Sequence, residues 1–262
     1  MSSSKETIGR TIGFVFVVCL VCALLVSFSA VQLKPLQTAN KLLDKQTKIL
    51  EASNLLEFAT KPGNDIVATY NRFVEAKMID LDSGEFIEGL SQAEIDMFDE
   101  RRNSRDVTKS DKPENDIAGI NRRSHDAVIY LVRNGGGEIE TVVLPIVGSG
   151  LWDLMYGYVG LAADLNTVSN VVYSDHKETP GLGAEVMNPK WKALWPGKKI
   201  YNESGDVAIQ IVKGGSKKGD IYGVDALSGA TLTSNGVERT LHFWFSKQGY
   251  KPFITKNRGG LK

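Results

Sequence analysis

The sequence predicts an α+β fold with a mainly antiparallel sheet and flanking helices, preceded by one N-terminal transmembrane helix. Three observations predict it. Residues Ile12–Val31 form an uncharged apolar run. Two strand-like runs, Asp126–Arg133 and Glu138–Val147, flank a turn that contains three glycines, and Thr231–Ser246 has helical periodicity. Together they indicate a membrane anchor followed by a large globular domain.

The apolar run at the N-terminus has the length of a bilayer-spanning helix, which needs about 20 apolar residues. A signal peptide has a shorter apolar region of roughly 7–15 residues, although Ser27-Phe28-Ser29 offers a small-x-small cleavage pattern. The length favours a retained anchor over residues 1–32. Basic residues flank the run on both sides, so charge does not determine its orientation.

An amphipathic stalk is expected over residues 33–64. Between Lys34 and Phe58, apolar residues recur at a loosely helical spacing, which would extend the anchor helix outward. The turn-forming residues Lys61-Pro62-Gly63-Asn64-Asp65 then stop this helix. The globular domain is therefore expected to begin at residue 65.

The globular domain is expected over residues 65–262, with a charged surface insertion at 85–116. Within it, Glu94–Asp116 is dense in charge and has little apolar periodicity, which indicates a solvated excursion without an assigned function. Runs rich in β-branched and aromatic residues predict strands at Ile66–Leu81, Asp126–Arg133, Glu138–Val147, Tyr156–Leu161, Val168–Tyr173 and Asp206–Val212. The helix over Thr231–Ser246 would bury one face, made of Val237, Leu241, Trp244 and Phe245.

Composition excludes several functions. Lysine and arginine (31) balance aspartate and glutamate (31), so the chain lacks the basic surface of a nucleic-acid-binding protein. Both cysteines, Cys19 and Cys22, lie in the apolar run, which leaves the rest of the chain without a disulfide or a thiolate metal site. The three histidines are scattered, and the segment nearest to a phosphate loop, Gly214–Gly219, has Asp220 where a lysine should follow. The residues therefore do not predict a hydrolase or a nucleotide-driven enzyme.

One specific segment is the Pro-Gly loop Glu178–Gly183, which reads E-T-P-G-L-G. Pro180 has a fixed φ and biases Thr179 toward an extended conformation, while Gly181 and Gly183 permit positive φ and close backbone approach. A loop of this kind can place its amides against a flat ligand. The alternative interpretation is an ordinary Pro-Gly turn.

The second specific segment is Asp225–Thr231, which reads D-A-L-S-G-A-T and runs directly into the predicted helix. Unpaired backbone N–H groups and the positive end of the helix dipole meet there, beside the hydroxyls of Ser228 and Thr231. The small residues Gly229 and Ala230 leave room for a phosphate to reach the backbone. The alternative is a helix that Ser228 caps, which does not explain the rest of the segment.

The Asp225–Thr231 segment resembles the flavinylation motif of FMN-binding domains. These domains occur in the C subunit of sodium-translocating NADH:quinone reductases and in the G subunit of the related Rnf electron-transport complexes. The Pro-Gly loop, Gly150-Leu151-Trp152 and Val212-Lys213-Gly214-Gly215 look like other recurring pieces of the family. The resemblance spans nearly the whole chain, and it is closer to the C subunit of the sodium pump through Ser228–Val237 and through the N-P-K-W sequence at Asn188–Trp191.

The resemblance implies FMN joined covalently, through its phosphate, to the hydroxyl of Thr231. A flavin transferase would deliver it from FAD and release AMP, and the chain would then relay electrons without a catalytic residue of its own. The residues that the resemblance places around the FMN are Thr231, Ser228, Gly229, Ala230, Asp225, Glu178, Thr179, Gly181, Leu182, Gly183, Trp152, Lys213 and Gly214. Among them, the resemblance assigns Asp225 and Ser228 to recognition by the transferase or to the shape of the loop.

The resemblance also implies partners and a location. The partners are the other membrane subunits of an NADH:ubiquinone reductase that exports sodium, and the flavin transferase during maturation. The soluble domain would lie on the periplasmic face of a bacterial inner membrane. Two alternatives stay open at this point: an Rnf-type G subunit or stand-alone anchored flavoprotein, and an anchored binding or sensor module with an exchangeable anionic ligand.

Overall fold

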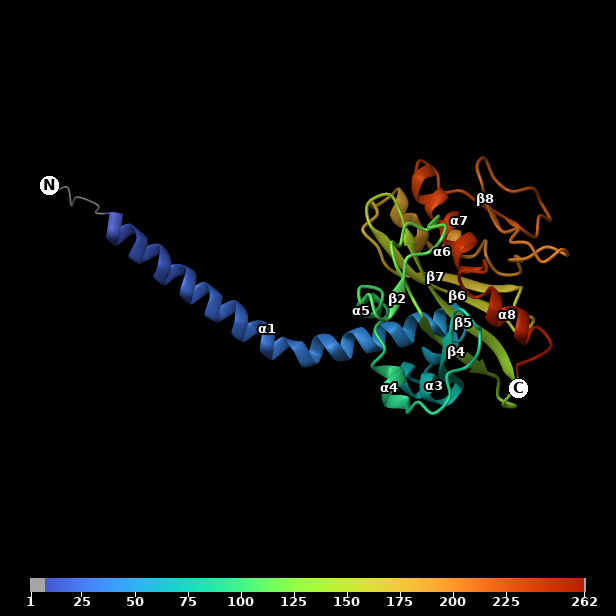
Figure 1. Ribbon diagram of the computed structural model, residues 1–262, viewed down its shortest axis with the longest axis horizontal. Helices are drawn as coiled ribbons and strands as arrows, with labels where there is room; N and C mark the ends of the chain where they lie inside the picture. Colours follow the sequence, from blue (N-terminus) through green and yellow to red (C-terminus); the bar gives the residue numbers. More distant parts are fainter. Residues whose placement is uncertain (1–7, 262) are drawn as a thin grey trace. The chain divides into compact units, whose positions relative to one another are not determined.

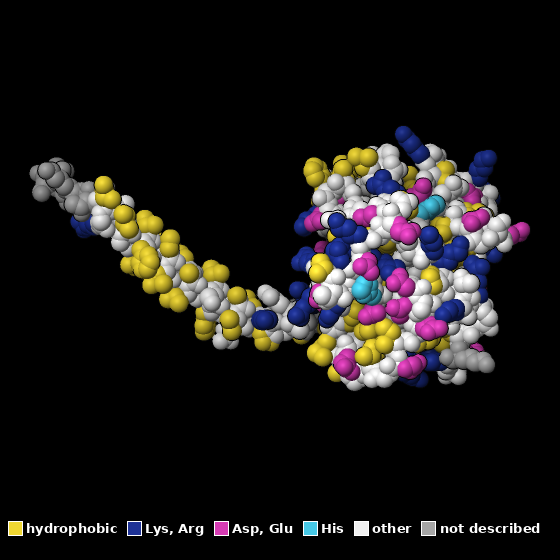
Figure 2. All heavy atoms as spheres, in the orientation of Figure 1, with side chains coloured by type: hydrophobic (Ala, Val, Ile, Leu, Met, Phe, Trp, Pro, Cys, Tyr) yellow, Lys and Arg dark blue, Asp and Glu magenta, His cyan; other side chains and the backbone are white. Residues whose placement is uncertain are grey.

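The computed structural model describes residues 8–261, and contacts divide the chain into two compact units after Asp44. Helix α1 (Ile8–Ala52) begins in the first unit and ends in the second (Figure 1). Among the described residues, α1 is the one helix long and apolar enough to span a membrane, and Figure 2 shows its apolar side chains. The predicted apolar helix over Ile12–Val31 is therefore present, and residues 1–7 of the predicted anchor region lie outside the described ones.

The last turns of α1 pack inside the second unit. Gln46, Ile49, Leu50 and Ala52 are buried, and the helix ends in a Schellman motif in which Asn54 has a φ of 60°. In this motif the Leu55 N–H donates to the Leu50 carbonyl at 2.8 Å, and the Asn54 N–H donates to the carbonyl of residue 51 at 3.2 Å. Residues from 45 onward, which the sequence assigned to the stalk, thus contribute to the core of the globular unit.

A five-stranded antiparallel sheet forms the centre of the globular unit, in the order β1-β4-β5-β6-β7 (Figure 1). Its strands are β1 (Val74–Asp80), β4 (Asp126–Arg133), β5 (Ile139–Ser149), β6 (Leu154–Ala162) and β7 (Val168–Asp175). The predicted hairpin is confirmed between β4 and β5. Its turn is held by the Asn134 side chain, whose Oδ1 accepts from the Gly136 and Glu138 N–H groups at 2.9 and 3.1 Å.

Each face of the sheet packs against different helices. One face packs against α7 (Thr231–Trp244) and α8 (Lys251–Asn257), which supply Val237, Leu241, Trp244, Phe253 and Ile254 to the larger core. The buried face predicted for the first of these helices is confirmed. The other face is covered by the end of α1 and by residues of α3 (Ile66–Phe73) and α4 (Gln92–Asp96), and it forms a second apolar cluster. Alternating residues of the strands serve the two clusters because successive strand side chains point to opposite faces.

Two predicted strands are corrected. Residues Ile66–Phe73 form helix α3, and only Val74–Asp80 of the expected strand is extended. The helix begins because the Asp65 carboxylate caps it, accepting from the Val67 and Ala68 N–H groups at 2.8 and 3.1 Å. The strand expected over Asp206–Val212 is reduced to β8 (Gln210–Val212), preceded by an isolated bridge between residues 201 and 207.

The charged insertion is more structured than its sequence indicated. It holds α4 (Gln92–Asp96), α5 (Glu100–Asn103) and β2 (Ser110–Asp111), which pairs with β3 (Arg123–Ser124). A capping box starts the first helix and an Asp99 cap starts the second. Because Ile95 and Ser110 are buried, the interpretation of Glu94–Asp116 as a solvated excursion was wrong in part. The segment lacks apolar periodicity, and its short helices are stabilised instead by N-terminal caps and by a few buried contacts.

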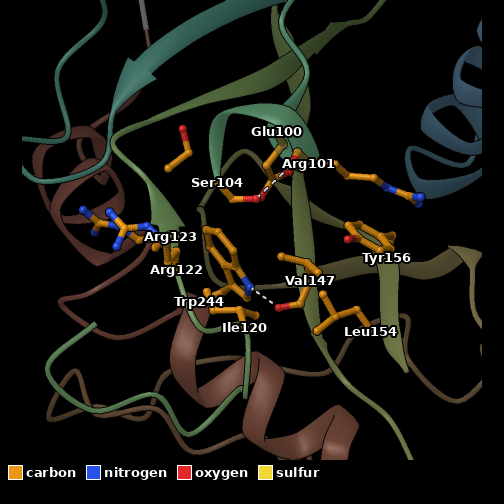
Figure 3. A pocket seen from close by; sticks show the side chains of 11 residues that line it. Glu100, Arg101, Ser104, Ile120, Arg122, Arg123, Val147, Leu154, Tyr156 and Trp244 are labelled. Carbon is orange, nitrogen blue, oxygen red and sulfur yellow. Dashed lines mark hydrogen bonds between the residues drawn. The ribbon is translucent and has the colours of Figure 1, made fainter. Parts of the chain in front are cut away.

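A small cavity of about 20 Å³ lies under this insertion, with room for about one water (Figure 3). Its walls include Glu100 and Arg101 of α5, Tyr156 of β6 and Trp244 of α7. Trp244 is thirteen residues after Thr231 on the same helix, which places their backbones about 20 Å apart. Burial raises the pKa of Glu100 to about 7, partly offset by the charge of Arg101.

Stability should depend on pH through Glu100. Its pKa in the folded chain is raised from 4.5 to about 7, so the fold favours the protonated carboxyl. The stabilisation is complete below pH 4.5 and is lost as the pH rises through 7. Relative to Glu100→Gln, we expect the parent to lose about 1–3 kcal/mol of unfolding free energy over this range. Thermal unfolding in detergent at several pH values measures it, and parallel pH profiles for the two proteins would contradict it.

Candidate functional site

The start of α7 is open. Ala230 occupies the N-cap position, and within the described residues no side chain hydrogen-bonds to cap this helix. The cap that Ser228 could have supplied does not form, and Ser228 and Thr231 are exposed while the Ala230 methyl is buried in the core. Backbone N–H groups of the first turn are therefore available to an anion beside the Thr231 hydroxyl. This arrangement fits the phosphate of FMN.

The Pro-Gly loop lies against the Asp225–Thr231 segment. Gly229 has a φ of 71°, and a Cβ at this position would lie 3.1 Å from Cδ2 of Leu182. Gly181 has a φ of 75°, which the turn after Pro180 requires. The turn closes through the Thr179 carbonyl, which accepts from the N–H groups of Leu182 and Ala184 at 3.1 Å each. Two motifs that are far apart in the sequence thus form one surface.

Glu178 joins three segments from beneath this surface. Its side chain is buried, with 5% of its area exposed. Oε1 accepts from the Leu151 and Trp152 N–H groups at 2.9 and 3.1 Å, and Oε2 accepts from the Thr233 hydroxyl. The sequence placed Glu178 at the flavin ring, but its carboxylate is directed at protein donors. It holds the Gly150-Leu151-Trp152 segment, the Pro-Gly loop and α7 together.

Two glycines make room for this carboxylate. A Cβ on Gly150 would collide with Oε1 of Glu178, and a Cβ on Gly183 would collide with Oε2. Gly183, which the sequence placed at the cofactor, is buried and starts the short 3₁₀ helix η1 (Gly183–Met187). Its small size therefore serves the packing of Glu178 against α7.

Four exposed apolar side chains lie on the segments that meet at this site. They are Leu151, Trp152, Leu182 and Leu232, each at least 44% exposed. The Trp152 indole is fixed at its edge, because its Nε1–H donates to the Thr179 hydroxyl at 3.1 Å. Large exposed apolar side chains that gather in one place indicate a ligand or partner site. Leu182 and Leu232 adjoin the open helix terminus, so a group held there by its phosphate would find an apolar surface next to it.

The loop after β8 is joined to the start of the Asp225–Thr231 segment. Strands β8 and β9 (Gly223–Asp225) pair in parallel, so Lys213 and the Asp225–Thr231 segment leave the same edge of this small sheet. Asp225 Oδ1 accepts from the Ser216 N–H and hydroxyl at 2.7 and 3.0 Å. Gly214, with a φ of 87°, lies in the loop that these bonds fix. The Asp225 carboxylate thus fixes the loop after β8.

Two contributors were absent from the predicted set. Thr233 is 1% exposed and donates to Glu178, and Ser216 anchors the lysine-containing loop to Asp225. The serine directly after two glycines could have indicated a loop anchor. Thr233 lies four residues before Val237, on the helix face that the periodicity predicts to be buried, so the helical spacing could have distinguished it from Thr231.

Comparison with known proteins places this site in a family. The FMN-binding domain family matches residues 150–246, which contain every element of the site. The fold and the site therefore define an FMN-binding domain, and the cofactor class is FMN. Among the described residues, no group of three or more histidine, cysteine, aspartate or glutamate side chains could hold a metal ion.

Relatives along the full chain define the family further. The chain is 43% identical to the C subunit of the Na(+)-translocating NADH-quinone reductase of Vibrio alginolyticus, over 99% of both chains. It is 43% identical to that of Yersinia pestis, over 98% of this chain and 96% of the relative. The crystal structure of Shewanella oneidensis NqrC has a TM-score of 0.78 and 39% identity, covering 83% of this chain and 98% of the other. The chain belongs to the NqrC family, the C subunits of Na(+)-translocating NADH-quinone reductases.

Proposed function

We propose that this chain is an electron carrier that holds FMN through a phosphoester on Thr231, within a membrane Na+-translocating NADH:ubiquinone reductase. The exposed Thr231 hydroxyl at the open start of α7 carries the proposal. Thr233, the next hydroxyl of this type, is buried and engaged with Glu178. The site therefore presents one threonine hydroxyl where both a phosphate and a transferase could reach it.

The attachment step uses FAD and a flavin transferase. The Thr231 oxygen forms a bond to the phosphorus of the FMN half of FAD, and the bond from that phosphorus to the AMP phosphate breaks. AMP leaves, the hydroxyl proton is released, and no electron is transferred. Backbone N–H groups of the first turn of α7 stabilise the phosphate charge in FAD and in the product. Gly229 keeps this approach free of a side chain.

The noncovalent part of the site orients the cofactor. When bound, FMN supplies reversible uptake and release of electrons. Leu182 and Trp152 offer apolar surface to a flat ring, and Thr179 fixes the edge of the Trp152 indole at 3.1 Å. Lys213 and the backbone at Gly214 border the site from the loop after β8. A covalent tether keeps the local concentration of the cofactor high, so dissociation does not interrupt electron transfer.

The family supports the remaining assignments. The partners are the other membrane subunits of the reductase, in which electrons pass from NADH to ubiquinone and sodium is exported, and the flavin transferase during maturation. Helix α1 anchors the chain once in a bacterial inner membrane, with the globular unit in the periplasm. The candidate span in α1 and the NqrC relatives support the anchor.

A denaturing gel tests the proposed linkage. The chain, coproduced with a flavin transferase, should retain flavin fluorescence after electrophoresis in detergent, because an ester survives denaturation. The open terminus of α7 could also hold an exchangeable phosphate, as an anchored binding module would. Loss of all fluorescence from the protein band, together with free flavin in the dye front, would favour that second function and contradict ours.

A further inference from the structure

The end of α1 is fixed to a four-residue helix, α6 (Pro189–Lys192). The Lys192 ammonium donates to Oε1 of Glu51, and these side chains are only 14% and 17% exposed. The carbonyl of Glu51 also accepts from the Asn170 side chain of β7 at 3.1 Å. Oε2 of Glu51 also accepts from Lys48, one turn earlier in α1, at 3.3 Å. Removing Lys192 therefore leaves the carboxylate paired within α1, whereas neutralising Glu51 leaves the largely buried Lys192 ammonium without this partner. The last turn of α1 is thereby held to α6 and to the central sheet.

The neighbouring residue of α6 contacts the flavin attachment motif, Asp225–Thr231. The buried Trp191 indole donates from Nε1 to the carbonyl of Asp225 at 2.9 Å. Its ring packs edge-on against Trp195, with 5.3 Å between the ring centroids. The side chain of Asp225 fixes Ser216 in the neighbouring loop. One hydrogen bond from α6 therefore reaches the residue that begins the motif and organises its surroundings.

The N-P-K-W sequence builds α6 as a stiff connection. Asn188 caps the helix, accepting from the Lys190 N–H at 2.9 Å, and Pro189 occupies its first turn. Consecutive helical residues project about 100° apart, so Trp191 and Lys192 reach different neighbours from one backbone segment. The proposed function does not use these residues.

We propose that α6 couples the end of α1 to the attachment motif, which makes Trp191 and Lys192 positioning residues for the attachment of FMN at Thr231. The proposal rests on the proposed function. The path runs from Glu51 through the adjacent residues Lys192 and Trp191 to the Asp225 carbonyl. Weakening the ion pair between Glu51 and Lys192 should therefore make the Asp225–Thr231 motif more mobile, although this ion pair lies outside the motif.

Two measurements on the full chain in detergent test this coupling. In apoprotein made without a transferase, Lys192→Met should accelerate amide hydrogen exchange of residues 225–234 by about threefold or more. With purified transferase and FAD, Lys192→Met and Trp191→Phe should each slow the attachment of FMN by about threefold or more. Glu51→Gln weakens the same ion pair from the α1 side and should reproduce both effects. It provides the test if Lys192→Met or Trp191→Phe does not fold.

Lys190→Met is the matched control. Lys190 lies on the same helix and loses the same charge, but it is exposed and forms no ion pair within residues 8–261. Its exchange and attachment rates should equal those of the parent. Unchanged exchange and attachment in folded Lys192→Met and Glu51→Gln would overturn the coupling, as would equal effects in Lys190→Met. A parent chain without covalent flavin would instead contradict the proposed function, and the exchange measurement would still decide the coupling.

Discussion

Thr231→Ala should abolish covalent FMN completely while the chain remains folded. Thr231 is exposed at the start of α7, and its hydroxyl forms no hydrogen bond within residues 8–261. Losing one hydroxyl contact to a charged phosphate costs about 1.5–3 kcal/mol, so an exchangeable ligand held by several backbone N–H groups would bind more weakly but would still bind. An ester requires the oxygen itself. Denaturing gel fluorescence and mass spectrometry of the tryptic peptide that ends at Arg239 measure the loss.

Two variants keep a hydroxyl and serve as controls for this loss. Thr231→Ser retains a nucleophilic oxygen and should retain part of the attachment. Thr233→Ser retains the donor to Glu178 in the buried position and should carry FMN as the parent does. One flavin per chain in denatured Thr231→Ala, or an adduct that maps to Thr233, would show that the assignment of the attachment residue is wrong.

Glu178→Ala should destabilise the apoprotein by about 3–5 kcal/mol. The substitution removes the acceptor of two backbone N–H groups and of the Thr233 hydroxyl in a buried place, and each unsatisfied donor costs about 1–3 kcal/mol. For a chain of this size the loss corresponds to a fall in melting temperature of about 10 °C. Thermal unfolding of the full chain in detergent, without flavin, measures it.

Glu178→Gln removes the negative charge of the side chain but keeps atoms that can hydrogen-bond to the same partners. Its amide oxygen can accept from the Leu151 and Trp152 N–H groups, and its amide nitrogen can donate to the Thr233 oxygen. We expect a smaller loss of about 1–2 kcal/mol. The exposed Glu203→Ala should change the melting temperature little. If Glu178→Ala melted with the parent, the carboxylate would not hold the three segments together.

Much of the fold could be predicted because its signals are local. The apolar run, the hairpin around Asn134 and the buried face of α7 each follow from neighbouring residues through length, turn chemistry or periodicity. The structure confirms all three elements. The local signals failed at Ile66–Phe73, where an Asp65 cap that looked like part of a turn starts a helix. They also failed in the charged insertion, where short capped helices carry too few apolar residues to show a period.

The features of the site also divide into those that the local sequence predicts and those that tertiary packing decides. The sequence was enough to identify the Asp225–Thr231 segment and the Pro-Gly loop, and to place the Asp225–Thr231 segment directly before a helix. Packing of the whole chain directs Glu178 at protein donors and places the end of α1 inside the globular unit. Local patterns could not predict these two features, because burial and hydrogen-bond partners depend on segments far apart in the chain. Those contacts exist only once the sheet and α7 have packed.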